Sequence, residues 1–287
     1  MEHADVLVVL DDVVDKMMQE QTLGFSPDVL SVLDDVEASV KDIEMLKFRI
    51  SQEILARLFS YTCCAYYGTL KKGEVHTFYE VVTRLGMAQT KAMILMLALQ
   101  LLARDDKEIE VIFARCFSSA VMGKVLARQF GLREELAKRV ELGGLFSEIG
   151  RMILKVYKKF HAPEDERIDE GFISRYHLYL AERIIEIFAL PEYLKSLLFH
   201  ENIVVESNFL TLAGIMRLAI DTVSESFRRE GNCFVVEVIP MPAGQDTDAS
   251  IEHDIECQYA AVGLGKYLKI IKGRERILPP YEPANQK

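Results

Sequence analysis

The cysteines are the first residues whose chemistry could matter. They are odd in number, and none lies in a C-x-x-C pair or near a histidine at zinc spacing; they are Cys63, Cys64, Cys116, Cys233 and Cys257. Cys63 and Cys64 are adjacent, but no His or Asp stands close in the sequence to activate either thiol. We therefore expect free thiols that serve packing, as in a reducing cytoplasm.

One His-Asp dipeptide, His253-Asp254, has residue types suited to metal binding or proton transfer. It lies in a polar, acidic segment (244–254), where we expect a solvated loop or the start of a helix. The nearby run Gly263-Leu264-Gly265-Lys266 resembles part of a phosphate-binding loop, but it lacks a third glycine and a preceding strand. Neither feature predicts a catalytic site.

A basic cluster close to the C-terminus opposes only Glu275 and comprises Lys266, Lys269, Lys272, Arg274 and Arg276. Such a run is typical of a solvated helix face. The alternatives are docking to the acidic N-terminal segment and contact with phosphate or another anionic partner.

Composition narrows the classes of protein. The chain has 287 residues, is 50% hydrophobic and carries a net charge of −10. Acidic residues crowd the first 45 positions, where Lys16 and Lys41 are the only basic ones. These values exclude a disordered chain, and the overall charge disfavours nucleic-acid binding, which needs a basic face.

No segment is predicted to cross a membrane or to direct export. The first residues lack a basic region and a cleavage site. The longest apolar run, Ala92 to Ala103, contains Gln100 and is shorter than the ~20 residues that span a bilayer. We expect a cytoplasmic protein with a buried helix here.

Few glycines and prolines favour an all-α fold. Residues 4–18 form an amphipathic helix with a Val/Leu/Met stripe, which a second lobe or another copy of the chain should cover. Helical periodicity continues to about residue 104, interrupted by a loop at 65–73. Further helices are expected at 107–130, 133–158, 170–188, 191–201 and 208–228.

The character changes after Gly231. Residues 233–239 are β-branched and aromatic and predict a strand, whereas 258–271 look helical. The strand needs a partner, and we expect a hairpin with a strand in 252–260. The predicted organisation is an N-terminal helix (1–22), a two-lobed domain (23–105 and 106–230), and a C-terminal strand and helix addition with a frayed tail (231–287).

Five motifs in register then resemble one known family. CCAYYG at Cys63–Gly68 is similar to the N-S-A-Y-Y-G turn of HDOD domains, and Arg84-Leu85-Gly86 to their r-L-G helix start. The others are Phe113-Ala114-Arg115-Cys116 for W-x-H-S, GGLFSEIG at 143–150 for G-L-L-H-D-I-G, and Phe188-Ala189-Leu190-Pro191 followed by His200 for W-x-L-P and an H-H pair. The resemblance implies an all-helical, two-lobed HDOD-like bundle whose second lobe is related to the HD phosphohydrolases.

In that superfamily a His, a His-Asp pair and a later Asp bind a divalent metal that activates water. Carried onto this chain, the first His position is Arg115 and the pair is Ser147-Glu148. The later Asp falls near Ile220 or Asp221. Arg115 cannot act as a ligand, and serine is a poor one. We therefore expect no metal in this degenerate HD pocket.

Arg115 and Glu148 remain open to two interpretations, an ordinary polar contact each or an ion pair in which Arg115 replaces the metal. His177 and His200 match family positions in flanking helices and are expected to be structural residues.

The resemblance favours a bacterial, non-catalytic signal-transduction output or adaptor module with no cofactor. It would bind a protein partner in a signalling pathway or a small ligand, and could self-associate through the N-terminal helix. The alternatives are a metal-dependent HD-type phosphohydrolase and a nucleic-acid-linked regulator using the 266–276 cluster.

Overall fold

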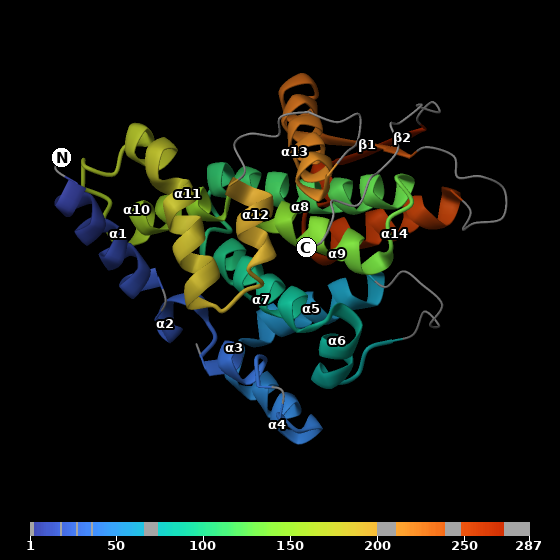
Figure 1. Cartoon of the computed structure of the whole chain (residues 1–287), viewed down its shortest axis with the longest axis horizontal. Helices are drawn as coiled ribbons and strands as arrows, with labels where there is room; N and C mark the ends of the chain where they lie inside the picture. The colour runs from blue at the N-terminus through green and yellow to red at the C-terminus, as the bar shows by residue number, and fades with distance from the viewer. Residues whose placement is uncertain are drawn as a thin grey trace. The chain divides into compact units, whose positions relative to one another are not determined.

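The structure, a computed structural model, describes residues 3–17, 19–26, 28–35, 37–65, 74–199, 211–238 and 248–272. These residues are mainly helical and include one two-stranded sheet (Figure 1). The expected all-α fold class is confirmed. The chain divides into two compact units: unit 1 comprises Met1–Phe113 and Glu148–Pro191, and unit 2 comprises Ala114–Ser147 and Glu192–Lys287. Each unit takes two separate stretches of chain, in contrast to the consecutive lobes expected from the sequence.

Unit 1 is helical in all its described elements. They are α1 (His3–Met17), α2 (Glu20–Leu23), α3 (Asp28–Val32), α4 (Val40–Met45), the 3-10 helix η1 (Leu46–Arg49), α5 (Gln52–Ala65), α6 (Phe78–Leu85), α7 (Met87–Leu102), the first part of α8 (Lys107–Gln129), α10 (Ile149–Phe160) and α11 (Glu170–Ile187). Capping boxes at Ser39 and Thr77 start α4 and α6. The apolar run within α7 is buried as predicted, with Ile94 and Leu97 inaccessible to solvent.

The N-terminal helix α1 uses its apolar stripe to pack inside unit 1. The buried side chains are Val6, Val9, Leu10, Val13 and Met17. They face α10, a helix of the expected second lobe, and Tyr157 of α10 donates a hydrogen bond to Asp12 of α1. The stripe is therefore covered within the chain, by a helix of the expected second lobe, and not by another copy of the chain.

The Tyr157–Asp12 contact also changes the ionisation of both groups. Burial, together with the hydrogen bond to Asp12, raises the pKa of Tyr157 to about 12. The same hydrogen bond lowers the pKa of Asp12, and Lys16 contributes in the same direction. The contact therefore requires a protonated Tyr157 and an ionised Asp12.

A buried lysine on α7 caps the carboxyl end of α11. Lys91 is only 2% exposed, and its ammonium donates to the carbonyl of Phe188 at 2.8 Å and also contacts Asp34. The next residue, Ala189, has a positive φ of 44°, which is uncommon for a residue with a Cβ. A cation at the carboxyl end of a helix satisfies terminal carbonyls and complements the helix dipole. Lys91 thereby fixes the turn that follows α11.

Unit 2 contains the rest of α8 with α9 (Glu134–Phe146), α12 (Tyr193–Phe199), α13 (Leu212–Arg229), β1 (Phe234–Val238), α14 (Asp248–Ala261), the 3-10 helix η2 (Gly265–Tyr267) and β2 (Leu268–Lys272). The single helix expected at 133–158 is wrong, because the chain leaves helical geometry between α9 and α10. Glu148 there has φ −127° and ψ 22°. The helices on both sides have buried faces, so the hydrophobic pattern runs through the break without marking it.

The C-terminal extension also differs from expectation. β1 is paired, as a strand must be, but its partner is β2 in parallel register, with Phe234 opposite Leu268. The predicted hairpin with 252–260 and the predicted helix at 258–271 are therefore wrong. Parallel strands need a crossover connection, and α14 supplies it. The helix begins at Asp248, earlier than expected, and acidic residues near a helix start interact favourably with the helix dipole.

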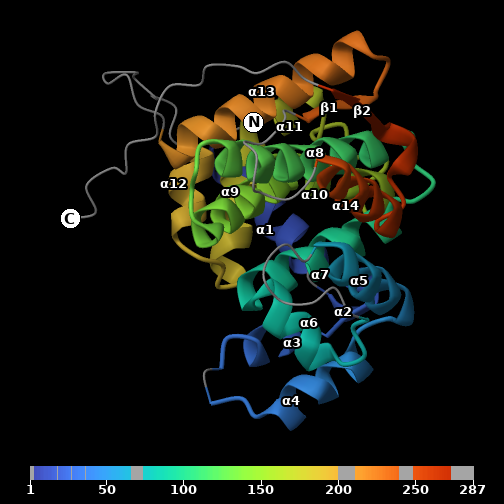
Figure 2. The same ribbon diagram turned by 90° about the vertical axis from the view of Figure 1, so that its right-hand side faces the viewer.

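Tyr259 anchors α14 against α8, and Figures 1 and 2 both show these helices side by side. Its hydroxyl, inaccessible to solvent, donates to Ser118 Oγ at 2.6 Å. Its ring meets Phe117 edge-on at 5.1 Å and stacks with Phe234 of β1. Burial raises the pKa of Tyr259 well above its usual value. The extension is thus part of unit 2, as predicted for a segment too short to hold its own core.

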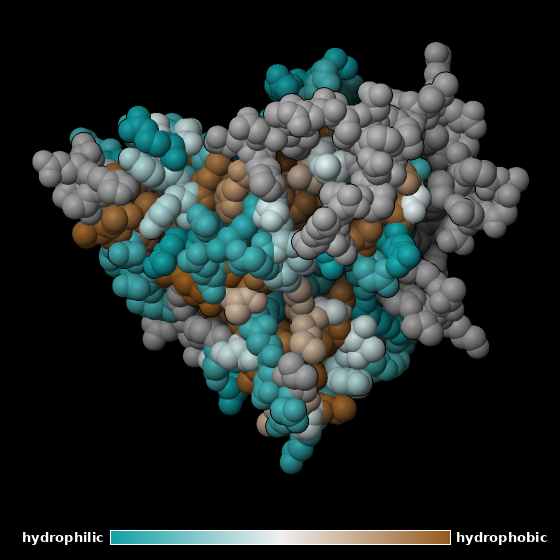
Figure 3. Space-filling view, in the orientation of Figure 1, coloured by the Kyte–Doolittle hydropathy of each residue, from teal (hydrophilic) through white to brown (hydrophobic). Residues whose placement is uncertain are grey.

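Among the described residues, no single helix has the length and hydrophobicity needed to cross a membrane. α6 and α7 together pass on length and composition, but they meet at a 112° bend. On the face shown in Figure 3, hydrophobic residues lie in separate areas among hydrophilic ones.

Candidate functional site

The degenerate HD positions are divided between the two units, and two of them, Ser147 and Glu148, form the break between α9 and α10. Arg115 and Ser147 belong to unit 2, whereas Glu148 and His177 belong to unit 1. His200 lies outside the described residues. The ion pair expected between Arg115 and Glu148 therefore stays a prediction.

Two glycines of the GGLFSEIG motif fix the packing on either side of this break. In unit 2, a Cβ on Gly144 would lie 2.4 Å from the backbone nitrogen of Ala120 on α8. In unit 1, a Cβ on Gly150 would lie 1.8 Å from the carbonyl oxygen of His177 on α11. Both helix pairs thus approach more closely than any other residue would allow. The second contact sets His177 beside the start of α10.

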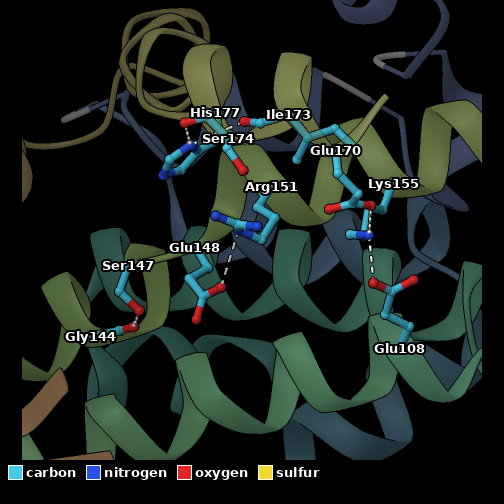
Figure 4. Close-up of polar contacts among 10 residues, drawn as sticks. All are labelled: Glu108, Gly144, Ser147, Glu148, Arg151, Lys155, Glu170, Ile173, Ser174 and His177. Atoms are coloured by element: carbon cyan, nitrogen blue, oxygen red, sulfur yellow. Dashed lines mark hydrogen bonds and ion pairs between the residues drawn. The ribbon is translucent and has the colours of Figure 1, made fainter. Parts of the chain in front are cut away.

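Glu148 pairs with an arginine that the sequence analysis did not single out. The Nε atom of Arg151, one helical turn further along α10, lies 3.5 Å from the Glu148 carboxylate (Figure 4). Both side chains are mostly buried, with 26% of Arg151 and 21% of Glu148 exposed. The signal was present in the sequence, because an acidic and a basic residue three apart share a helix face. A guanidinium therefore does neutralise this carboxylate within unit 1.

His177 is held in one orientation by the backbone of its own helix. Its Nδ1 lies 3.1 Å from the Ile173 carbonyl oxygen and 3.0 Å from that of Ser174. Carbonyl oxygens only accept hydrogen bonds, so Nδ1 carries the proton. Burial lowers the pKa of His177, the charge of Arg151 lowers it further, and Glu148 acts in the opposite direction. His177 is therefore neutral near pH 7.

Ser147 uses its hydroxyl within unit 2. The Oγ atom donates to the Gly144 carbonyl oxygen at 2.8 Å, in the last turn of α9. The family's later Asp position falls near Asp221 on α13, and this carboxylate forms an exposed pair with Arg217 at 3.2 Å. Neither residue presents an oxygen prepared for a metal.

A second polar cluster joins α8, α10 and α11 of unit 1. Lys155, with 8% of its side chain exposed, contacts the carboxylates of Glu108 and Glu170 (Figure 4). Burial lowers the pKa of Lys155, but the two carboxylates outweigh it and the net change is upward. No local sequence pattern indicates this cluster, since its members are distant along the chain. The cluster therefore links the three helices through ion pairs and has a structural role.

The residues present do not fit the metal of the HD superfamily. That metal needs neutral imidazoles and carboxylates together. In this chain the side chains at the ligand positions are the guanidinium of Arg115, the hydroxyl of Ser147 and the ion-paired carboxylate of Glu148. Among the described residues, no three His, Cys, Asp or Glu side chains group in a way that could hold an ion.

The C-terminal basic cluster is only partly described. Lys269 pairs with Glu230 at 2.8 Å, and the Lys266 ammonium lies 5.0 Å from the centre of the Tyr267 ring. Lys272 ends β2, and the remaining members, Arg274 and Arg276, lie outside the described residues.

The helical fold and the residues at the carried-over His-Asp positions together define a relative of the HD superfamily. The chain belongs to the HDOD domain family, whose model matches residues 25–188. The match ends before the expected boundary at 230, so His200 and Asp221 lie beyond it.

Solved structures support the same fold. A protein from Shewanella amazonensis SB2B, named provisionally as a metal-dependent phosphohydrolase, is 14% identical, with a TM-score of 0.54 over 90% of this chain and 98% of its own. A second protein of that organism, named provisionally as a phosphohydrolase, is 15% identical, with a TM-score of 0.51 over 91% of this chain and 98% of its own. No curated protein matches the sequence.

Proposed function

We propose that this chain is a non-catalytic signal-transduction module of the bacterial cytoplasm, an output or adaptor domain that binds a protein partner or a small ligand. The observation that carries the proposal is the donor set at the HD positions. Arg115 and Ser147 stand where metal ligands would be needed, and Glu148 is neutralised by Arg151. Membership of the HDOD family supports a role of this kind.

Metal-dependent phosphohydrolysis is the rival suggested by the names of the structural neighbours. A metal held by Glu148 would lie close to the Arg151 guanidinium. At about 4 Å, repulsion between unit charges costs about 4 kcal/mol at an intermediate dielectric, and a divalent ion doubles that cost. The nucleic-acid-linked alternative has less support, because Lys269 already pairs with Glu230.

The first experiment tests the non-catalytic part of the proposal. The full chain is incubated with Mn²⁺ or Fe²⁺, gel-filtered, and assayed for retained metal and for hydrolysis of an activated phosphodiester. We expect neither retained metal nor turnover. The variant with Arg115→His, Ser147→His and Glu148→Asp restores the HD ligands and should gain Mn²⁺ binding. Metal-dependent hydrolysis by the unmodified chain, abolished in Glu148→Gln, would refute the proposal.

A second experiment tests whether the Glu148–Arg151–His177 cluster, which is partly accessible, contributes to binding. Cross-linked partners are captured with the unmodified chain, with Arg151→Gln and with the control Arg217→Gln, whose ion pair on α13 is also one helical turn long but exposed. We expect Arg151→Gln to lose the partner that the other two retain, with capture carried out well below the melting temperature of every variant. Equal capture by all three would exclude this cluster from the binding surface.

A further inference from the structure

Arg151 on α10 is a mostly buried cation whose outer hydrogen-bond donors have no protein partner. Its side chain is 26% exposed, and its Nε atom lies 3.5 Å from the Glu148 carboxylate. The remaining N–H donors of a guanidinium lie on its terminal nitrogens. Among the described residues, none accepts a hydrogen bond from these nitrogens, which, unlike Nε, are open to solvent. Unpaired donors on a mostly buried side chain point to a ligand that pairs with them.

His177 on α11 places a hydrogen-bond acceptor near these donors. Its Nδ1 atom bonds to the Ile173 and Ser174 carbonyl oxygens at 3.1 and 3.0 Å, so the neutral ring presents a lone pair at Nε2. Within the described part of the chain, no donor meets Nε2. Figure 4 shows the Arg151 guanidinium between the His177 ring and the Glu148 carboxylate. The cluster therefore presents an unpaired donor and an unpaired acceptor in one place.

The surrounding structure holds both side chains in position. Gly150 approaches α11 so closely that a Cβ there would lie 1.8 Å from the His177 carbonyl oxygen. Glu148 holds the guanidinium of Arg151 from the other side. Burial lowers the pKa of His177, and the neighbouring charge of Arg151 lowers it further. Groups held in this way lose little conformational freedom when a ligand binds.

The charges of the cluster favour a ligand without net charge. Glu148 and Arg151 compensate each other, and His177 is neutral near pH 7. Arg151 attracts an anion but Glu148 repels it, and a cation meets the reverse. A fully ionised anion also has no proton to donate to His177 Nε2. A neutral ligand with an acceptor next to a donor avoids both costs.

We propose that Arg151 and His177 bind the –CO–NH– edge of a neutral heterocycle, of the kind that uracil and guanine present. The ligand carbonyl oxygen accepts from the terminal nitrogens of Arg151, and the adjacent ring N–H donates to His177 Nε2. Cytosine and adenine carry an unprotonated ring nitrogen at that position, so its lone pair faces the lone pair of Nε2. The inference rests on the proposed function, because it gives the non-catalytic module the class of its small ligand.

A ligand-observed NMR titration of the full chain with nucleosides, in EDTA and near neutral pH, tests the proposal. Uridine and guanosine should bind at least about tenfold more tightly than cytidine and adenosine, the factor expected for one hydrogen bond lost in a mostly buried site. The closest control is 3-methyluridine, in which a methyl group replaces the ring N–H. It should lose affinity by the same factor.

Variants assign the binding to these two side chains. Arg151→Gln and His177→Phe should each weaken uridine binding by at least about tenfold. His177→Gln keeps an acceptor oxygen and should bind uridine more tightly than His177→Phe. The matched control is Arg217→Gln, which removes an exposed ion pair on α13 and should leave the affinity unchanged.

Three results would overturn the proposal. The first is that neither uridine nor guanosine binds. The second is equal affinity for uridine, cytidine and 3-methyluridine. Both use the unmodified chain, so they decide the matter even where a variant fails to fold. The third is unchanged uridine binding in both Arg151→Gln and His177→Phe. Each of them leaves the non-catalytic role standing, because metal retention and hydrolysis test that role separately.

Discussion

Replacing Gly150 with alanine perturbs the contact between α10 and α11, which positions His177 beside Glu148. The added Cβ would lie 1.8 Å from the His177 carbonyl oxygen, and the obstructing atom belongs to the backbone. A side chain could turn away from the new methyl group, but a helix carbonyl cannot. The two helices must therefore move apart.

The structure gives the size of the effect. Ordinary contact begins near 3.4 Å, so the Gly150 and His177 backbones must separate by 1.6 Å, which is 3.4 minus 1.8. Overpacking costs about 1–3 kcal/mol or more, and the rigid obstacle favours a loss of about 3 kcal/mol. The higher helix propensity of alanine returns only about 0.5–1 kcal/mol. The net loss is about 2–2.5 kcal/mol, so at about 2–4 °C per kcal/mol the melting temperature should fall by about 4–10 °C.

Thermal unfolding followed by circular dichroism measures this change against a matched control. Gly171 occupies the same second position in α11, and its Cβ would meet only the exposed Asp169 carboxylate, at 3.3 Å. Gly171→Ala should leave the melting temperature unchanged or raise it slightly. If Gly150→Ala melted within about 2 °C of the unmodified chain, the close approach of α10 and α11 would be disproved.

Three further outcomes are expected. Lys91→Met should lower the free energy of unfolding by about 1–3 kcal/mol in chemical denaturation, because the Phe188 carbonyl loses its buried donor; an unchanged value would contradict this. Because the pKa of Tyr157 is raised, its contact stabilises the fold fully below pH ~10, and this stabilisation is lost as pH rises toward about 12. Because the pKa of Asp12 is lowered, the same contact stabilises the fold above pH ~4, and this stabilisation is lost in acid. Tyr157→Phe should flatten both limbs of the melting-temperature profile against pH, and an unaltered profile would refute the contact. Deletion of residues 1–22 should lower solubility or change the elution volume in gel filtration, and no change in either, with an equal melting temperature, would show that α1 covers nothing.

The sequence was sufficient for most helices because their hydrophobic period is strong. The stripe of α1 and the apolar run of α7 both proved buried. The prediction of a helix at 258–271 in the C-terminal extension was wrong for a physical reason. Residues 268–272 combine Ile with Lys, which suits either a helix face or a strand, and only the pairing with β1 decides between them.

The candidate site was predictable only in part. Substitutions at the HD positions could be recognised residue by residue from the family motifs, and the chemistry of Arg115 and Ser147 followed directly. The pairing of Glu148 with Arg151 was visible as a three-residue spacing but competes with many similar pairs on helices. The approach of Gly150 to His177 depends on tertiary packing, which no local pattern encodes.

The interleaved composition of the two units has a consequence for synthesis on the ribosome. Unit 1 ends at Pro191, although its first stretch is complete at Phe113. At about 5–20 residues per second, the 78 residues between these points take about 4–16 s to translate. During that interval α7 has no α10 to pack against, and Lys91 has no Phe188 carbonyl to bind. The helices α2, α5 and α6 of the first stretch already pack against α7, so only its α10-facing side and the buried Lys91 wait for the second stretch. That exposed apolar side makes this protein a candidate substrate for chaperones that act during translation.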